Sequence, residues 1–282
     1  DNHFQDLKRV IAASSAFAKR ITVILPFLYE SRQHKRTKLE SLDSSLALNE
    51  LVSYGVNNII TFDAHDPRID NSIPLNGFDN FLPPFQFIKA LLEKNNDIKI
   101  DNEHLMIISP DEGAMHRAVY FSNVLGVDMG MYYKRLDYSR YVNGRHPIAA
   151  YEFLGPKIEG KDMILIDDMI SSGDTIIKIA SLLKEKGAGR VYICSTFGFF
   201  TDGLDKFDDA YKKGYFDKLL TTNLVYQSPE LLEKPYYISC DMSKYIALII
   251  DTLNHDTSVS HLLNPVDRIK RCVTNYMSQH EK

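Results

Sequence analysis

The sequence predicts an α/β protein, in which mainly parallel sheets are flanked by helices, and three observations support this class. Residues 163–166 form an unbroken apolar run, which is typical of a strand buried on both faces. Apolar residues recur with helical spacing over 176–183, and residues 191–194 have the composition of a second strand. Apolar runs at 58–63 and 105–109 also end in polar segments. Open α/β sheets bind ligands at such carboxyl ends of strands.

Length and composition limit the function. The 282 residues suit one large or two medium domains, and 44% hydrophobic residues are enough for ordinary cores. The formal net charge of −4 argues against a nucleic-acid partner. Cys194, Cys240 and Cys272 show no paired spacing, which indicates a reducing compartment without structural zinc. No apolar run approaches the roughly 18 residues that span a bilayer, so we expect a cytoplasmic protein without a membrane partner.

The first part of the chain predicts a small domain over residues 1–82. An amphipathic helix at 1–13 places Phe4, Leu7, Val10 and Ile11 on one face, and a strand follows at 21–25. A helix starting near Asp43 precedes the strand at 58–63. Because Pro74, Pro83 and Pro84 punctuate residues 72–85, this stretch is expected to join two domains.

The remaining elements predict a second domain over residues 83–263, followed by a helical extension at 264–282. We expect residues 135–160, which have little periodicity and contain Asn143–Gly144, to form a mobile loop that closes over a phosphate site. Helices are expected at 85–92, 116–125, 203–214 and 242–253, and strands at 105–109, 129–133 and 219–223.

Two polar segments of the first domain are candidate nucleotide-binding loops. Arg32, Lys35, Arg36 and Lys38 lie close together after the first strand, where they would attract a polyphosphate. A solvated charge run is the alternative interpretation. At the end of the strand at 58–63, Asp63 and His65 have a spacing that can serve a metal-bound nucleotide, although such a pair is often structural.

The segment 167–175 is the strongest candidate site. Asp167 and Asp168 follow the apolar strand and suit sugar hydroxyls or a hydrated magnesium ion. A turn rich in small and hydroxyl residues then leads into a helix, where backbone N–H groups can bind a phosphate. Together these groups describe a ribose phosphate; a capped turn with solvated acids is the alternative. The turn consists of Ser171, Ser172, Gly173, Asp174 and Thr175.

These motifs carry a resemblance to a known family. Residues 167–175 resemble the phosphoribosyl-pyrophosphate (PRPP) loop of phosphoribosyltransferases and ribose-phosphate pyrophosphokinases. The order of all the motifs resembles the pyrophosphokinases in particular, over roughly residues 2–263. The other motifs are Arg32-Gln33, Asp63-Ala64-His65, Pro110-Asp111-Glu112-Gly113, Lys134, Thr221-Thr222-Asn223 and Ser258-Val259-Ser260-His261-Leu262.

The resemblance implies two phosphoribosyltransferase-like (type I) domains and a diphosphoryl transfer from Mg²⁺-ATP to the 1-hydroxyl of ribose 5-phosphate, giving PRPP and AMP. It implies that Lys134, with Arg135 beside it, stabilises charge during transfer, and that the loop at 167–175 binds ribose 5-phosphate. It also implies a homo-oligomer, a dimer or a hexamer. The implied ATP-binding residues are Arg32, Gln33, His34, Lys35, Arg36, Asp63 and His65, and the implied metal ligands are Asp63, His65 and Asp111.

Several residues depart from the family pattern. His34, Leu136, Ser171 and Asp174 stand where the family has other residues, and Asp174 would repel a phosphate unless its carboxylate points away. The family's first strands have no counterpart here, so we expect either a fragment or a shortened relative. Two other functions remain open: a non-catalytic regulatory subunit associated with such an enzyme, and a phosphoribosyltransferase.

Overall fold

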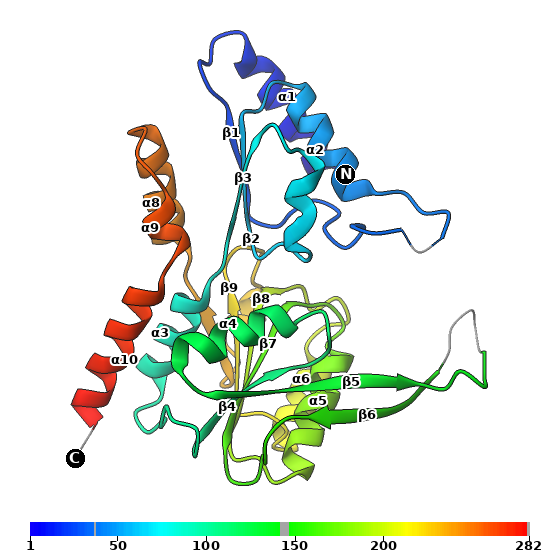
Figure 1. Ribbon diagram of the computed structural model, residues 1–282, viewed down its shortest axis with the longest axis vertical. Helices are drawn as coiled ribbons and strands as arrows, with labels where there is room; N and C mark the ends of the chain where they lie inside the picture. Colours follow the sequence, from blue (N-terminus) through cyan, green and yellow to red (C-terminus); the bar gives the residue numbers. More distant parts are fainter. Residues whose placement is uncertain (37, 142–146, 281–282) are drawn as a thin grey trace. The chain divides into compact units, whose positions relative to one another are not determined.

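The computed structural model describes residues 1–36, 38–141 and 147–280. The chain divides into a first unit, Asp1–Pro83, and a second unit, Pro84–Lys282. Each unit contains its own sheet and its own hydrophobic core (Figure 1).

The first unit is built on a parallel sheet with the strand order β1-β2-β3. Its core includes Phe4, Leu48 and Leu51, which come from the helices that pack on the sheet. Val10 was expected on the apolar face of the first helix, but it is 63% exposed. The elements are α1 (Asn2–Ser15), β1 (Thr22–Leu25), α2 (Asp43–Ser53), β2 (Asn58–Phe62), the 3₁₀ helix η1 (Pro67–Ser72) and β3 (Gly77–Phe81).

Strand β3 lies inside the stretch that the prolines led us to expect as a junction. Its sequence Gly-Phe-Asp-Asn-Phe does not alternate between apolar and polar residues, so the pattern did not predict a strand here. It pairs in parallel with β2 from Asn58–Gly77 to Phe62–Phe81. The tertiary pairing therefore fixes this strand more than its composition does.

The second unit contains a larger sheet with the order β10-β9-β8-β7-β4-β5-β6. All neighbouring strands are parallel except β5 and β6, which pair antiparallel at one edge. The strands are β4 (Leu105–Ser109), β5 (Asp128–Leu136), β6 (Ile148–Leu154), β7 (Asp162–Ile170), β8 (Val191–Gly198), β9 (Lys218–Thr222) and β10 (Tyr237–Cys240).

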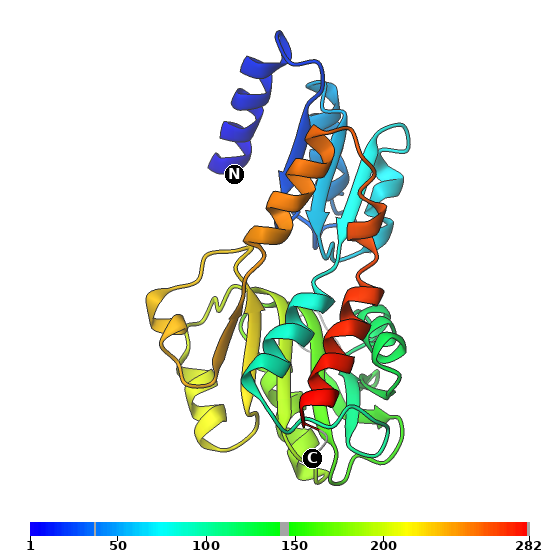
Figure 2. The ribbon, with the colours of Figure 1, turned by 90° about the vertical axis from the view of Figure 1, so that its left-hand side faces the viewer.

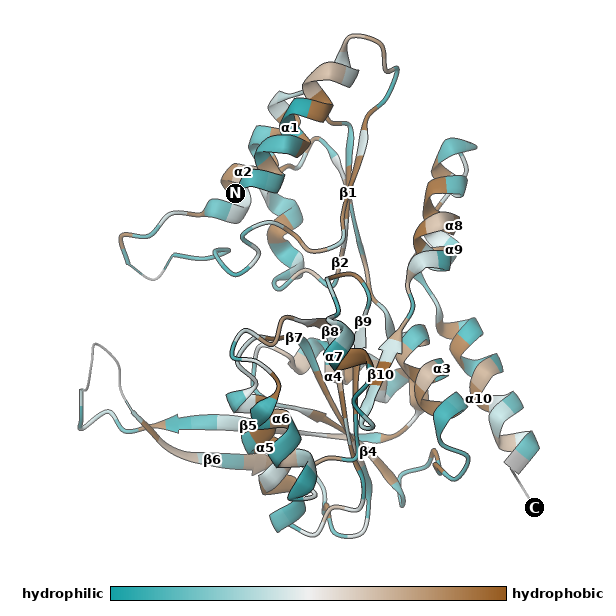
Figure 3. Ribbon diagram, turned by 180° about the vertical axis from the view of Figure 1, so that it is seen from behind, coloured by the Kyte–Doolittle hydropathy of each residue, from teal (hydrophilic) through white to brown (hydrophobic). Residues whose placement is uncertain are grey.

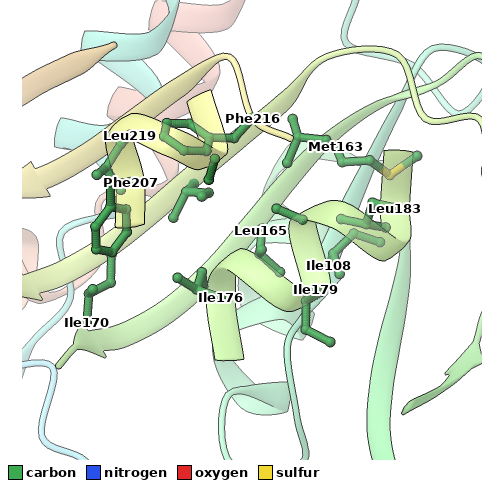
Figure 4. Packing of buried hydrophobic residues seen from close by; sticks show 14 of the residues in the cluster. Ile108, Met163, Leu165, Ile170, Ile176, Ile179, Leu183, Phe207, Phe216 and Leu219 are labelled. Atoms are coloured by element: carbon green, nitrogen blue, oxygen red, sulfur yellow. The ribbon is translucent and has the colours of Figure 1, made fainter. Parts of the chain in front are cut away.

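Helices cover both faces of this sheet. On one face α5 and α6 pack over β7 and β8, and Ile176, Ile179 and Leu183 of α5 are buried there as their helical spacing predicted (Figure 4). On the other face lie α4 and the neighbouring pair α3 and α10 (Figure 2). The helices are α3 (Pro84–Lys94), α4 (Met115–Leu125), α5 (Asp174–Glu185), α6 (Asp205–Lys212), α7 (Pro229–Leu232), α8 (Ser243–Asn254), α9 (Ser260–Leu263) and α10 (Val266–His280).

The hydropathy of the second unit follows these layers. The strand β7 carries the apolar run 163–166 and every residue of β8 is buried, whereas the outer surfaces of the helices carry hydrophilic residues (Figure 3). Continuous apolar strands of this kind belong to a parallel sheet covered on both faces. The predicted α/β class is confirmed.

The prediction of a loop over residues 135–160 was wrong in part. β5 extends to Leu136, and β6 forms an antiparallel hairpin with it from Met131–Leu154 to Leu136–Ile148. The hairpin was missed because polar residues such as Lys134 and Arg135 interrupt the apolar pattern of an edge strand. Asn143 and Gly144, which belong to the expected loop, lie outside the described residues.

Candidate functional site

The two acids Asp167 and Asp168 lie inside β7, which continues to Ile170 and therefore past the strand end that the sequence predicted. β7 pairs with β4 only as far as Leu165, but with β8 as far as Ile170. Successive side chains of a strand point to opposite faces of the sheet. The two neighbouring side chains therefore leave the strand on opposite faces, although their carboxyl groups remain close enough to interact.

Asp168 faces α4 and is buried there against Arg117. The Arg117 guanidinium lies 3.7 Å from a carboxylate oxygen of Asp168, and the two side chains are 3% and 5% exposed, respectively. Arg117 also approaches the backbone oxygen of Gly113 at 3.5 Å. A buried charge requires a partner of opposite charge, and each of these residues supplies one to the other.

Asp167 interacts with Asp168 and Asp111, and its environment disfavours the charged form. Burial, the neighbouring Asp168 and then the charge of Asp111 raise the pKa of Asp167 well above its usual range. The backbone N–H of Asp168 donates to an Asp167 carboxylate oxygen at 2.9 Å, which opposes this effect only in part. A cation or a hydroxyl-bearing ligand would relieve the repulsion between these carboxylates.

Asp111 and Lys134 connect two predicted roles. One oxygen of the Asp111 carboxylate accepts the backbone N–H groups of Gly113 and Ala114 at 3.0 and 3.3 Å, which holds the loop after β4. Its other oxygen lies 3.8 Å from the ammonium of Lys134 on β5. The predicted catalytic lysine and a predicted metal ligand thus lie close together, and the charge of that ligand, Asp111, also acts on Asp167.

Arg135, the neighbour of Lys134 on β5, is turned to the opposite face of the hairpin. Its guanidinium lies 2.6 Å from a carboxylate oxygen of Glu152 on β6. The Tyr133 hydroxyl donates to the other oxygen of Glu152, and both contacts hold the pKa of that carboxyl below its usual range. In this arrangement Arg135 supports the hairpin. Of these two basic residues, Lys134 is the one that lies beside Asp111.

The predicted phosphate loop joins β7 to the N-terminus of α5. Gly173 is the residue before α5 and has a φ of +83°, a left-handed conformation that favours glycine. A side chain at this position would also collide with the ring of Phe207, which lies 2.3 Å from the place of a Cβ atom. Thr175 lies in the first turn of α5, where backbone N–H groups lack partners within the helix. The loop therefore has the backbone geometry of an anion site.

Asp174, the residue that was expected to repel a phosphate, has its charge offset within the loop region. Its carboxylate lies 2.8 Å from the ammonium of Lys206 and accepts the Ser172 hydroxyl at 2.9 Å. These two contacts, the lysine first, hold the pKa of Asp174 below its usual range. Ser171 is bound to the same neighbouring segment through its backbone oxygen, which accepts the N–H of Thr201 at 3.0 Å.

In the first unit the predicted ATP-binding loop follows β1. Arg32, Lys35 and Arg36 are exposed, so their charges are available to a ligand in solvent. Gln33 is also exposed, and its backbone oxygen accepts the Ser44 hydroxyl at 2.8 Å, which fixes the loop to the start of α2. The cationic cluster thus sits on a loop with a defined anchor.

Two imidazoles meet between the segments that follow β1 and β2. The rings of His34 and His65 are packed edge to face with centroids 5.2 Å apart, and Nε2 of His34 lies 3.6 Å from a carboxylate oxygen of Asp66. Burial and the charge of His65 lower the pKa of His34. Arg68 binds both Asp66 oxygens at 3.0 and 2.7 Å and lowers the pKa of Asp66 to about 2.

Asp63 occupies a different position from His65. It is 3% exposed and has a φ of +43°, an uncommon conformation for a residue other than glycine. Its backbone N–H donates to the oxygen of Phe81 at 2.9 Å, so the residue is built into the end of the sheet. Of the two predicted metal ligands of this loop, His65 is the one with a partly exposed side chain.

The described residues offer only a partial set of ligands for a magnesium ion. Among the described residues, no group of three or more histidine, cysteine, aspartate or glutamate side chains is placed to hold a metal ion. Mg²⁺ commonly uses one or two carboxylates, water and substrate phosphates instead of a complete protein cage. The interacting carboxylates Asp111 and Asp167 offer such a partial set of oxygen ligands in the second unit.

In the part of the chain that the structure describes, no helix combines the length and apolarity needed to cross a membrane.

Comparison with known proteins agrees with this geometry. Residues 84–234, more than half of the chain, match the family described as phosphoribosyl transferase domain. Residues 1–55 match the N-terminal domain of ribose phosphate pyrophosphokinase. The chain belongs to the ribose-phosphate pyrophosphokinase family. The resemblance inferred from the motifs is thereby confirmed.

Relatives within this family span most of the chain. The ribose-phosphate pyrophosphokinase of Vibrio parahaemolyticus is 27% identical over 267 residues, which cover 94% of this chain and 80% of the relative. That of Shewanella oneidensis is 28% identical over 269 residues, with coverage of 94% and 79%. The crystal structure of phosphoribosylpyrophosphate synthetase from Mycobacterium smegmatis superposes with a TM-score of 0.76 at 23% identity, covering 90% of this chain and 78% of that one. This superposition shows the fold.

Three residues of the second-unit site were not predicted from the sequence. Arg117, Lys206 and Phe207 each contact a predicted residue from another element: Asp168, Asp174 and Gly173, respectively. Lys206 and Phe207 lie more than 30 positions from their partners and belong to no motif that we identified. Arg117 lies four positions after the motif Pro110-Asp111-Glu112-Gly113, but nothing in its spacing indicates a partner on β7. Only the arrangement of the layers brings these pairs together.

Proposed function

We propose that this chain is a ribose-phosphate diphosphokinase. The 1-hydroxyl oxygen of ribose 5-phosphate attacks the β-phosphorus of ATP and forms the new P–O bond. The bond from the β-phosphorus to the oxygen that bridges it to the α-phosphorus breaks, and AMP leaves with that oxygen. The hydroxyl proton is released, and the other product is PRPP. The observation that supports this proposal is that Lys134 lies 3.8 Å from Asp111, whose charge acts on Asp167, in the unit that also contains the loop 171–175.

Each unit of the chain has its own part in this reaction. In the first unit, Arg32, Lys35 and Arg36 would bind the ATP polyphosphate, with Gln33, His34 and His65 beside it and Asp63 supporting the loop that presents His65. Such basic side chains neutralise the phosphates, and positioning supplies most of the acceleration. When bound, Mg²⁺ would neutralise phosphate charge and orient the transferring group.

In the second unit, the loop 171–175 would bind the 5-phosphate through backbone N–H groups and hydroxyls, and Asp167 would accept the ribose hydroxyls. Asp168, held by Arg117, would fix the strand that carries Asp167. Lys134 would stabilise the negative charge that develops during transfer. Because Arg135 is bound to Glu152, its role would be to hold the hairpin that carries Lys134.

Three functions were open from the sequence, and the names of the relatives favour the first. A phosphoribosyltransferase would consume PRPP with a base and would have no use for a cationic loop such as 32–36. A regulatory subunit would bind nucleotide without forming AMP. We also propose a cytoplasmic homo-oligomer, a dimer or a hexamer, which light scattering after size-exclusion chromatography would measure.

The deciding experiment is the formation of AMP and PRPP from Mg-ATP and ribose 5-phosphate, with Lys134→Ala and Lys157→Ala compared with the unmodified chain. Lys157 pairs with Glu159 on the surface of the same unit, so its variant is a matched control for the loss of one lysine. We expect Lys134→Ala to lower kcat by about 10²- to 10³-fold, as the loss of one charge-stabilising donor does. Absence of AMP from the folded, unmodified chain would reject the proposal, and AMP formation unaffected by Lys134→Ala would reject the role of Lys134.

A further inference from the structure

The phosphate loop is braced by a segment that the proposed mechanism does not use. Residues 201–207, which lead into α6, contact the loop at several points. The Thr201 N–H donates to the Ser171 backbone oxygen at 3.0 Å, and the hydroxyls of these two residues lie 3.3 Å apart. The Phe207 ring fills the space beside Gly173. The backbone and the apolar contact can therefore hold the loop's shape without any charged group.

Lys206 adds a contact of a different kind. Its ammonium donates to Asp174 at 2.8 Å and to Asp202 at 2.9 Å, and both carboxylates are partly exposed. The pKa of Lys206 is raised by these two partners, so the side chain is a stable cation. Exposed ion pairs of this kind contribute little to stability. The contribution of Lys206 to the stability of the fold is therefore expected to be small, and its main effect is on the charge of Asp174.

The charge at Asp174 explains that need. Asp174 is the first residue of α5, directly after the turn in which the 5-phosphate would bind. A carboxylate at this position opposes the binding of a phosphate dianion, because like charges a few ångströms apart repel even near solvent. Lys206 and the Ser172 hydroxyl occupy both oxygens of this carboxylate.

We propose that Lys206 is a positioning residue of the 5-phosphate subsite: it holds the Asp174 carboxylate toward α6 and cancels its charge, so that the loop 171–175 accepts the phosphate of the sugar. This inference rests on the proposed function, because it assumes that this loop binds ribose 5-phosphate. Lys206 acts through Asp174 and does not take part in the diphosphoryl transfer itself.

The test is a charge series in the full chain: Lys206→Gln, Asp174→Asn and the double variant. The dissociation constant of ribose 5-phosphate is measured by calorimetry, and KM and kcat are measured from AMP formation. We expect Lys206→Gln to raise the dissociation constant and KM about three- to tenfold, the size of one uncompensated charge near solvent, with kcat almost unchanged. Asp174→Asn is expected to lower both constants, and the double variant to return them close to the values of the unmodified chain.

Lys212→Gln is the matched control, because Lys212 lies on the same helix and its pair with Asp209 is remote from the loop. It removes the same net charge and should leave both constants unchanged. Raised salt should reduce the effect of Lys206→Gln, since screening acts on exposed charges. Thermal unfolding of all the variants should agree within a few degrees.

Three results would overturn the inference. The first is unchanged affinity in Lys206→Gln. The second is equal loss in Lys206→Gln and the double variant, which would make Lys206 a purely structural brace. The third is the absence of ribose 5-phosphate binding to the unmodified chain. If binding follows the charge series but no AMP forms, the inference holds and the proposed activity fails. If AMP forms but the affinity series is flat, the inference alone fails.

Discussion

The guanidinium of Arg117 lies 3.7 Å from a carboxylate oxygen of Asp168, and both side chains are almost completely buried. This pair links α4 to β7 directly behind the residue that we expect to bind the ribose hydroxyls. Buried ion pairs gain less than their geometry suggests, because both charges lose their hydration. Their importance appears when one partner is removed, since the other buried charge then loses its compensating charge.

Arg117→Met is therefore expected to reduce the free energy of unfolding by about 3–5 kcal/mol. Urea unfolding followed by circular dichroism measures this change. The matched control is Arg135→Met, which breaks the more exposed pair with Glu152 and should cost about 1 kcal/mol or less. The double variant Arg117→Met with Asp168→Leu should be more stable than Arg117→Met alone, because neither charge of the pair is then buried without the other. Equal losses from the two arginine variants would contradict this account.

Asp167→Asn is expected to stabilise the protein and to impair the reaction. The pKa of Asp167 is raised by burial and by the charges of Asp168 and Asp111, so its ionised form costs folding free energy above the pKa of the unfolded chain. The gain from the substitution should be absent well below pH 3.9, the usual value for aspartate, and should grow as the pH rises through the folded-state pKa. Thermal unfolding from pH 3 to pH 8 measures it.

The same variant should weaken ribose 5-phosphate binding, because an amide accepts fewer hydrogen bonds from hydroxyls than a carboxylate does. Gains in stability at the expense of function are common at such sites. Asp128→Asn is a suitable control: this residue lies at the start of β5, and its pair with Lys161 is partly exposed. A melting temperature for Asp167→Asn that does not exceed that of the unmodified chain at pH 8 would argue against the repulsion among these acids.

Gly173→Ala is expected to disable the phosphate loop for two separable reasons. The φ of +83° is unfavourable for alanine, and the new methyl group would meet the Phe207 ring. The left-handed conformation costs roughly 1 kcal/mol, and the collision adds to it. Adding Phe207→Ala should remove the steric part and leave the conformational part. Urea unfolding of the two single variants and the double variant gives the coupling between the sites. Additive losses would show that the ring does not restrict this position.

The unit from β7 through α5 to β8 could be predicted from the sequence because its burial follows two simple periods. The run 163–166 of β7 is apolar at every position, and Ile176, Ile179 and Leu183 recur at helical spacing. The resemblance of the loops added what periodicity cannot supply, namely which residues belong to one site. Lys134 and Asp111 are 23 positions apart, yet they meet because parallel neighbours β4 and β5 end at the same edge.

The remaining features depended on contacts between distant segments. β3 was missed because pairing with β2, not its own composition, makes it a strand. β6 was missed because an edge strand need not be apolar, and Lys134 and Arg135 occupy its partner. The partner of Asp174 could not be predicted because Lys206 is 32 positions away on another helix. Charge compensation of this kind leaves no periodic pattern in a sequence.

The alternation of side chains along β7 has a consequence for how the two neighbouring acids tolerate change. In a saturation mutagenesis screen scored separately for cellular abundance and for catalysis, position 168 should tolerate few residues in either score. Most replacements would remove the carboxylate that compensates the buried guanidinium of Arg117. Position 167 should accept many small polar residues without loss of abundance while losing catalysis. Two neighbouring aspartates are thus expected to be under different kinds of selection: Asp168 for folding and Asp167 for catalysis.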